Sequence, residues 1–117
     1  MTSDHELVLL VEDDDGVRDT MIAALADEGY DVVGAVDGQQ ALDLLATQRP
    51  CMIFLDLMMP GIDGWEVFRR LQADASLARI PVCIMTAVPH KAPVGATSIL
   101  PKPVPLQSVL DLLSAYC

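Results

Sequence analysis

Five residues of this 117-residue chain have side chains that together can support chemistry on a phosphoryl group. They are Glu12, Asp13, Asp56, Thr86 and Lys102. Each stands at or directly after the C-terminal end of a segment whose sequence predicts a β-strand. Three neighbouring carboxylates repel one another, and one of them holds a proton at neutral pH unless a cation joins them. The set therefore predicts a divalent metal site with oxygen ligands.

Magnesium is the ion that we expect at this site. Mg²⁺ binds through one or a few carboxylates, keeps several of its waters, and neutralises charge on a phosphoryl group during transfer. Asp56 is then a candidate nucleophile, because a carboxylate can form an aspartyl-phosphate. Thr86 can donate a hydrogen bond to one phosphoryl oxygen, and Lys102 can bring a positive charge to another.

The elements that must position these residues alternate along the chain. Short apolar runs predict strands at Leu7–Val11, Asp31–Val36, Cys51–Leu55, Pro81–Met85 and Ser98–Leu100. Apolar residues at helical spacing predict helices after Gly16, at Ala41–Leu45, at Val67–Leu71 and at Leu106–Leu113. This alternation indicates right-handed βαβ units, with a doubly wound parallel sheet covered by helices on both faces. In such an α/β fold the ligand site lies outside the carboxyl ends of the strands, where the five residues are expected to meet.

Four segments resemble the response-regulator receiver family, in the family's order and along nearly the whole chain. They read LVLLVEDD, FLDLMMPGIDGWEVFRRL, PVCIMTA and LPKPV. The resemblance implies a flavodoxin-like, five-stranded sheet of order 2-1-3-4-5. It also implies that Asp56 accepts a phosphoryl group from a histidine kinase or a phosphotransfer protein, as a switch in two-component signalling.

The resemblance further assigns roles to the other site residues. Asp13, Asp56 and the backbone carbonyl of Met58 would bind Mg²⁺, and Glu12 would act directly or through water. Thr86 would be the hydroxyl that moves toward the phosphoryl group. Lys102 would bridge to that group, with a cis peptide bond between Lys102 and Pro103.

The chain departs from the family between Thr86 and Lys102. This span is about one to two helical turns shorter than usual, and it contains Pro89, Pro93 and Gly95. We therefore expect the fourth helix to be shortened or absent. Ile99 also stands where the family usually has an aromatic residue that responds to activation. Phosphorylation is then expected to be read out differently, through residues 87–95 or another face.

Composition limits the class of protein. The chain has 7 Lys and Arg against 17 Asp and Glu, a formal charge of −10, which disfavours nucleic acid binding. Its apolar runs are too short to span a bilayer, and no cationic signal peptide begins it, so a cytoplasmic protein is expected. Cys51, Cys83 and Cys117 lack the spacing of a zinc or redox motif and are interpreted as structural thiols.

Residues 1–117 are interpreted as one receiver domain, ordered over about 5–116 and without an output domain; the chain is either a stand-alone regulator or part of a larger protein. It is not expected to be an enzyme, beyond catalysing its own phosphorylation and dephosphorylation. The alternative is a degenerate receiver that binds an unknown downstream protein without phosphorylation. An aspartyl phosphatase is disfavoured because Met58 occupies the place of its second acid.

Overall fold

The computed structural model describes residues 7–117, so the predicted start of order near His5 lies outside the described part. The strands are β1 (Leu7–Val11), β2 (Asp31–Ala35), β3 (Met52–Asp56), β4 (Val82–Thr86) and β5 (Ser98–Pro101). The helices are α1 (Asp15–Asp27), α2 (Gly38–Leu45), α3 (Gly64–Ala73), the 3₁₀ helix η2 (Pro89–Lys91) and α4 (Leu106–Tyr116). None of the helices in this part of the chain has the length and apolar character needed to cross a membrane.

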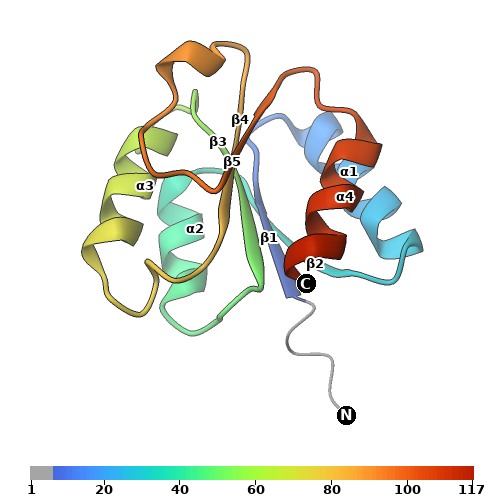
Figure 1. Cartoon of the computed structure of the whole chain (residues 1–117), viewed down its shortest axis with the longest axis horizontal. Helices are drawn as coiled ribbons and strands as arrows, with labels where there is room; N and C mark the ends of the chain where they lie inside the picture. The colour runs from blue at the N-terminus through green and yellow to red at the C-terminus, as the bar shows by residue number, and fades with distance from the viewer. Residues whose placement is uncertain (1–6) are drawn as a thin grey trace.

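The strands form one parallel sheet in the order β2-β1-β3-β4-β5, which confirms the predicted fold class and topology. The sheet lies between two layers of helices (Figure 1). Helices α2 and α3 cover one face, and α1 and α4 cover the other. The expected elements are all present, although β3 and β4 each begin and end one residue later than the sequence predicts.

The apolar strand runs divide between two cores because successive strand residues point to opposite faces. Leu9, Ile53 and Ile84 pack with α2 and α3 in one buried cluster. Leu10 and Phe54 pack with α1 and α4 in the other. Every residue of β3 and β4 is buried, as expected for central strands of a sheet that is covered on both faces.

An aspartate side chain caps the N-terminus of each of the helices α1, α2 and α3. The Asp14 side chain accepts a hydrogen bond from the Val17 amide at the start of α1. The Asp63 side chain does the same for the Glu66 amide at the start of α3. Each bond satisfies a backbone donor that has no partner within the helix. Asp14 and Asp63 are therefore the N-terminal caps of α1 and α3.

The region after β4 confirms the prediction of a shortened or absent fourth helix. In the described chain only the three-residue helix η2 lies between β4 and β5. Pro89 begins η2, and Pro93 follows two residues after its end. Proline lacks a backbone donor and clashes with the preceding turn, so a regular α-helix cannot form across both positions.

The interpretation of the cysteines as structural thiols is correct for Cys83 and wrong for the other two. Cys83 is free and buried, and burial raises the pKa of its thiol to about 12. Cys51 and Cys117 form a disulfide with their Cα atoms 5.6 Å apart. Their sequence separation is 66 positions, so no spacing motif reveals this pairing in the sequence. The end of α4 returns to the residue that precedes β3, at the edge of the sheet opposite the carboxyl ends of the strands.

Loss of the disulfide is expected to destabilise the fold. A closed loop of this length restricts the unfolded chain, so the variant Cys51→Ser/Cys117→Ser should lower the free energy of unfolding by about 2–4 kcal/mol. Denaturant titrations with and without a phosphine reductant measure the difference. The reductant should lower the stability of the wild type and leave the double variant unchanged. A wild type with the same midpoint in both conditions would contradict this prediction.

Candidate functional site

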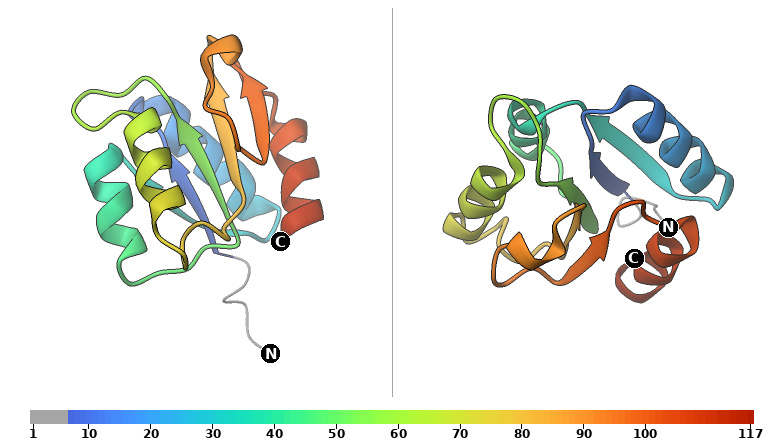
Figure 2. Two further views of the ribbon diagram at one scale, coloured as in Figure 1. Left: turned by 60° about the vertical axis from the view of Figure 1, so that its left-hand side comes forward. Right: turned by 90° about the horizontal axis from the view of Figure 1, so that it is seen from above.

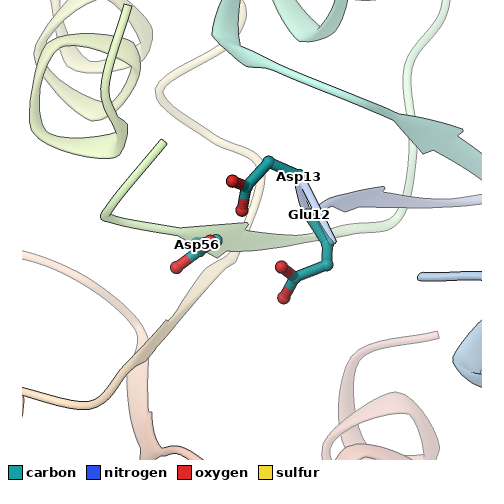
Figure 3. A group of neighbouring side chains, drawn as sticks. All are labelled: Glu12, Asp13 and Asp56. Atoms are coloured by element: carbon teal, nitrogen blue, oxygen red, sulfur yellow. The ribbon is translucent and has the colours of Figure 1, made fainter. Parts of the chain in front are cut away.

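Three carboxylates meet where β1 and β3 end. Val11 pairs with Leu55 across these parallel strands, so the residues that follow Val11 lie beside Asp56. One oxygen each of Glu12, Asp13 and Asp56 lies within 4.8 Å of the other two. Figure 3 shows these side chains at neighbouring strand ends, around a shared space. The structure thus brings together the three predicted carboxylates.

Lys102 also reaches this cluster, from the segment after β5. Its Nζ donates a hydrogen bond to Glu12 Oε1 at 2.8 Å and lies 3.3 Å from Asp56 Oδ1. Glu12 and Asp56 are only 1% and 3% exposed, whereas Asp13 is exposed to solvent. One ammonium among three ionised carboxylates leaves two negative charges, which a divalent cation balances.

The electrostatics of Asp56 reflect this crowding. Burial raises the pKa of the Asp56 carboxyl group to about 6, and the neighbouring Glu12 and Asp13 contribute to the rise, while Lys102 opposes it. Burial alone would lower the pKa of the Lys102 amine, but Glu12 and Asp56 outweigh that effect and raise it. The cluster therefore favours any added positive charge that reaches it.

Thr86 and the backbone of Lys102 are held together at the ends of β4 and β5. Thr86 pairs with Pro101, and the Lys102 amide donates to the Thr86 carbonyl oxygen at 2.8 Å. The Lys102–Pro103 peptide bond is cis, as the resemblance implies. Thr86 is buried, and its Oγ1 accepts a hydrogen bond from the Val88 amide at 3.0 Å.

The loop after β3 folds back onto the backbone of Asp56. The Gly64 amide donates to the Leu57 carbonyl oxygen at 2.9 Å. A Cβ atom at Gly64 would lie 2.3 Å from the Asp56 carbonyl oxygen, so only glycine fits there. Within this loop, the Met58 side chain is 62% exposed, and its amide lies 3.4 Å from Asp56 Oδ1.

Arg18 is a neighbour of the site that the sequence interpretation did not identify. Its guanidinium donates to the Glu12 carbonyl oxygen at 2.8 Å and pairs with Asp15. Its stem passes Gly34, where a Cβ atom would lie 3.1 Å from Arg18 Cδ. The glycine within the predicted second strand is the sequence signal for this close approach. Arg18 thus holds the backbone that presents Glu12.

A largely apolar groove of about 910 Å³ opens beside the cluster. It lies between α1 and the segment that joins β5 to α4, and Glu12 and Lys102 form part of its lining. Met21, Val104 and Leu106 supply apolar surface. A partner that approaches the carboxylates from this side therefore contacts apolar side chains next to charged ones.

Comparison with known proteins agrees with this fold and arrangement. The family model of the response regulator receiver domain matches residues 8–114. A curated relative, the response regulator MprA of Mycolicibacterium vanbaalenii, is 39% identical over 114 residues, which cover 92% of this chain and 48% of MprA. The chain thus spans about half the length of the curated relatives that it matches.

Solved structures show the same similarity. The Vibrio cholerae chemotaxis protein CheY4 superposes with a TM-score of 0.82 at 28% identity, over 95% of this chain and 98% of CheY4. The receiver domain of the Pseudomonas aeruginosa sensor histidine kinase PA1611, which has magnesium coordinated in its active site cleft, superposes with a TM-score of 0.86 at 27% identity, over 95% of this chain and 96% of that one. On the family match and the curated relatives, this chain belongs to the response regulator receiver domain family.

Proposed function

We propose that this chain is a phosphorylation-dependent signalling switch and that Asp56 is its phosphoacceptor. The observation that carries this proposal is the position of Asp56, a buried carboxylate beside Glu12, Asp13 and the Lys102 amine. Membership of the receiver family supports the same assignment. The phosphodonor is expected to be a histidine kinase or a phosphotransfer protein, and the downstream partner another protein.

The residues present fit a magnesium ion. Two negative charges remain after Lys102 is counted, and hard carboxylate oxygens are the ligands that Mg²⁺ prefers. Asp13, Asp56 and the Met58 carbonyl would hold the ion, with Glu12 acting directly or through water. When bound, the ion supplies neutralisation of charge on the phosphoryl group. The magnesium in the PA1611 receiver domain supports this proposal.

The chain's own side chains would accept the phosphoryl group and bind its oxygens. An Asp56 carboxylate oxygen would attack phosphorus, and the bond between phosphorus and the nitrogen of the donor histidine would break. Its electron pair would stay on that nitrogen, which takes up a proton from solvent, and Asp56 would carry the phosphoryl group as an aspartyl-phosphate. The Lys102 amine, freed from Asp56, can pair with a phosphoryl oxygen. The Thr86 hydroxyl can turn from Val88 and donate to a second oxygen. Lys102 already contacts the cluster, and Thr86 ends β4, the strand that pairs with β3 and Asp56.

A cytoplasmic location is part of this proposal, because the histidine kinase or phosphotransfer protein that supplies the phosphoryl group is expected to act there. The cytoplasm keeps most protein thiols reduced. The Cys51–Cys117 bond is therefore expected to persist there only where the fold protects it from reductants. The phosphoacceptor cluster does not depend on this bond, since it lies at the opposite edge of the sheet.

Phosphorylation by a small donor tests the proposed role of Asp56. With acetyl phosphate and Mg²⁺, intact-mass spectrometry should detect the addition of one phosphoryl group to the wild type and to Asp63→Asn, which keeps a capping side chain in the next loop. Asp56→Asn should gain none. A wild type without added mass would instead favour a degenerate receiver that acts without phosphorylation.

The buried charge of Asp56 should also make stability depend on pH. Folding raises the pKa of Asp56 from 3.8 to about 6, so between these values the folded chain binds more protons than the unfolded chain. The free energy of unfolding without metal should then fall as the pH rises through this window. Asp56→Asn removes that loss and should be more stable than the wild type at neutral pH by about 1–3 kcal/mol. The exposed control Asp31→Asn should keep the wild-type slope; equal slopes in all three proteins would refute the assignment.

The lifetime of the phosphorylated form depends on the residues that flank the phosphoryl position. Met58 and Val88 are apolar and cannot orient an attacking water, so slow loss of phosphate is expected. Replacing both with polar residues, as in Met58→Asn/Val88→Gln, should speed hydrolysis about tenfold, the effect of about one hydrogen bond in the transition state. Phosphate release after removal of the donor measures the rate. Met58→Leu/Val88→Ile is the matched apolar control, and an unchanged lifetime in the polar variant would disprove this prediction.

A further inference from the structure

A chain of three hydrogen bonds joins Thr86 to Trp65, and none of these bonds belongs to the carboxylate cluster. The Val88 amide donates to Thr86 Oγ1 at 3.0 Å. The Lys91 amide donates to the Val88 carbonyl oxygen at 2.9 Å. Trp65 Nε1 then donates to the Lys91 carbonyl oxygen, also at 2.9 Å. Helix η2 is therefore connected at its start to Thr86 and at its end to α3.

Apolar contacts hold the same segment against α3. Ala92 and Ala96 are partly buried against the core cluster that contains Phe68. Gly95 has a φ of +104° and lies against the Phe68 ring, with its Cβ position 3.8 Å from Cζ. Figure 2 shows this segment in orange, running from the end of β4 to the start of β5. Because no regular helix forms between β4 and β5, this segment packs directly on α3.

The start of α3 is itself fixed by the backbone of Asp56. Gly64 packs so closely on the Asp56 carbonyl oxygen and on Leu57 Cα that a Cβ atom would lie 2.3 and 2.6 Å from them. Trp65 follows Gly64 directly, so the indole is placed by the same contact. Helix η2 thus lies between two elements that are both anchored at the phosphoacceptor position.

This chain lacks the aromatic residue that usually responds to activation in receiver domains. Ile99 occupies the position of the usual aromatic residue, is 41% exposed, and has no hydrogen-bonding group. Trp65, in contrast, reaches η2 through its indole nitrogen. We propose that Trp65 positions η2 and that η2 transmits the state of Asp56 in place of the missing aromatic switch. This inference rests on the proposed phosphorylation of Asp56.

We call the chain of three hydrogen bonds from Thr86 through η2 to Trp65 the relay. The Thr86 hydroxyl would be the group that moves first in it. When Thr86 turns to donate a hydrogen bond to a phosphoryl oxygen on Asp56, its oxygen leaves the Val88 amide. That partly buried amide then needs another acceptor, because an unpaired buried donor is costly. Residues 88–91 shift to provide one, and the Lys91 carbonyl oxygen moves relative to the Trp65 indole. The environment of Trp65 therefore reports on the phosphoryl site.

The chain has one tryptophan, so tryptophan emission comes from Trp65 alone. The experiment adds beryllofluoride, a phosphoryl mimic, together with Mg²⁺ to the whole chain. Fluorine NMR of the bound mimic measures occupancy, and Trp65 emission measures the relay. In the wild type we expect a change in emission that saturates together with the bound mimic. Amide spectra should show the resonances of Val88 and Lys91 shifting in the same titration.

Two variants of Thr86 test the connection itself. Thr86→Ser keeps the hydroxyl and should keep the emission change. Thr86→Val has nearly the same shape without the hydroxyl, so it loses one hydrogen bond to the mimic and should bind it more weakly. At an occupancy by the mimic equal to that of the wild type, as measured by fluorine NMR, its emission should not change. In Trp65→Phe, which lacks the indole donor, the shifts of Val88 and Lys91 with bound mimic should shrink.

The outcomes separate this inference from the proposed function. If the mimic does not bind the wild type, the proposed function fails, and the relay fails with it. If the mimic binds and the emission of Trp65 stays constant, the phosphoacceptor assignment stands and the relay is wrong. An emission change that persists in Thr86→Val would likewise overturn the relay.

Discussion

The constraint on which this molecule depends is the crowding of negative charge at one edge of its sheet. Glu12 and Asp56 are buried there beside the exposed Asp13, and a single ammonium, that of Lys102, lies among them. Burial of like charges is unfavourable unless cations accompany them. The arrangement therefore lowers the stability of the metal-free fold and favours binding of a divalent ion. A bound divalent ion together with the Lys102 amine would concentrate positive charge there, and that charge would favour transfer of a phosphoryl group to Asp56.

The rest of the fold serves to hold these groups in place. Parallel register sets the end of β1 beside the end of β3, and the apolar faces of both strands fix that register through the two cores. Gly64 lets the start of α3 rest on the backbone of Asp56, and Arg18 holds the backbone of Glu12. The disulfide secures α4 at the far edge. Helix η2 does not hold the carboxylate cluster in place. It is connected instead to Thr86 at its start and to Trp65 at its end.

The alternation of strands and helices and the meeting of the carboxylates with Lys102 could be predicted from local patterns and from the rule for strand ends. The sheet order came from the resemblance to the receiver family, and the shortened fourth helix from the length of that segment compared with the family and from its prolines. Sequence reasoning missed the disulfide, the hydrogen bond of Trp65 and the hydrogen bond of Arg18 to the Glu12 carbonyl oxygen. The disulfide joins Cys51 to the chain end, which no spacing motif reveals. The hydrogen bond of Trp65 to the backbone at Lys91 depends on how a loop packs, and composition does not encode this.

The central claim is that the carboxylate cluster binds a divalent cation in order to carry a phosphoryl group on Asp56. A calorimetric titration of the chain with Mg²⁺ tests it most directly, with Asp13→Asn as the variant because Asp13 is exposed and its loss should spare the core. The account predicts one saturable site in the wild type and an affinity about tenfold or more weaker in the variant, a loss of at least about 1.4 kcal/mol. No binding by the wild type, or the same affinity in both proteins, would contradict it.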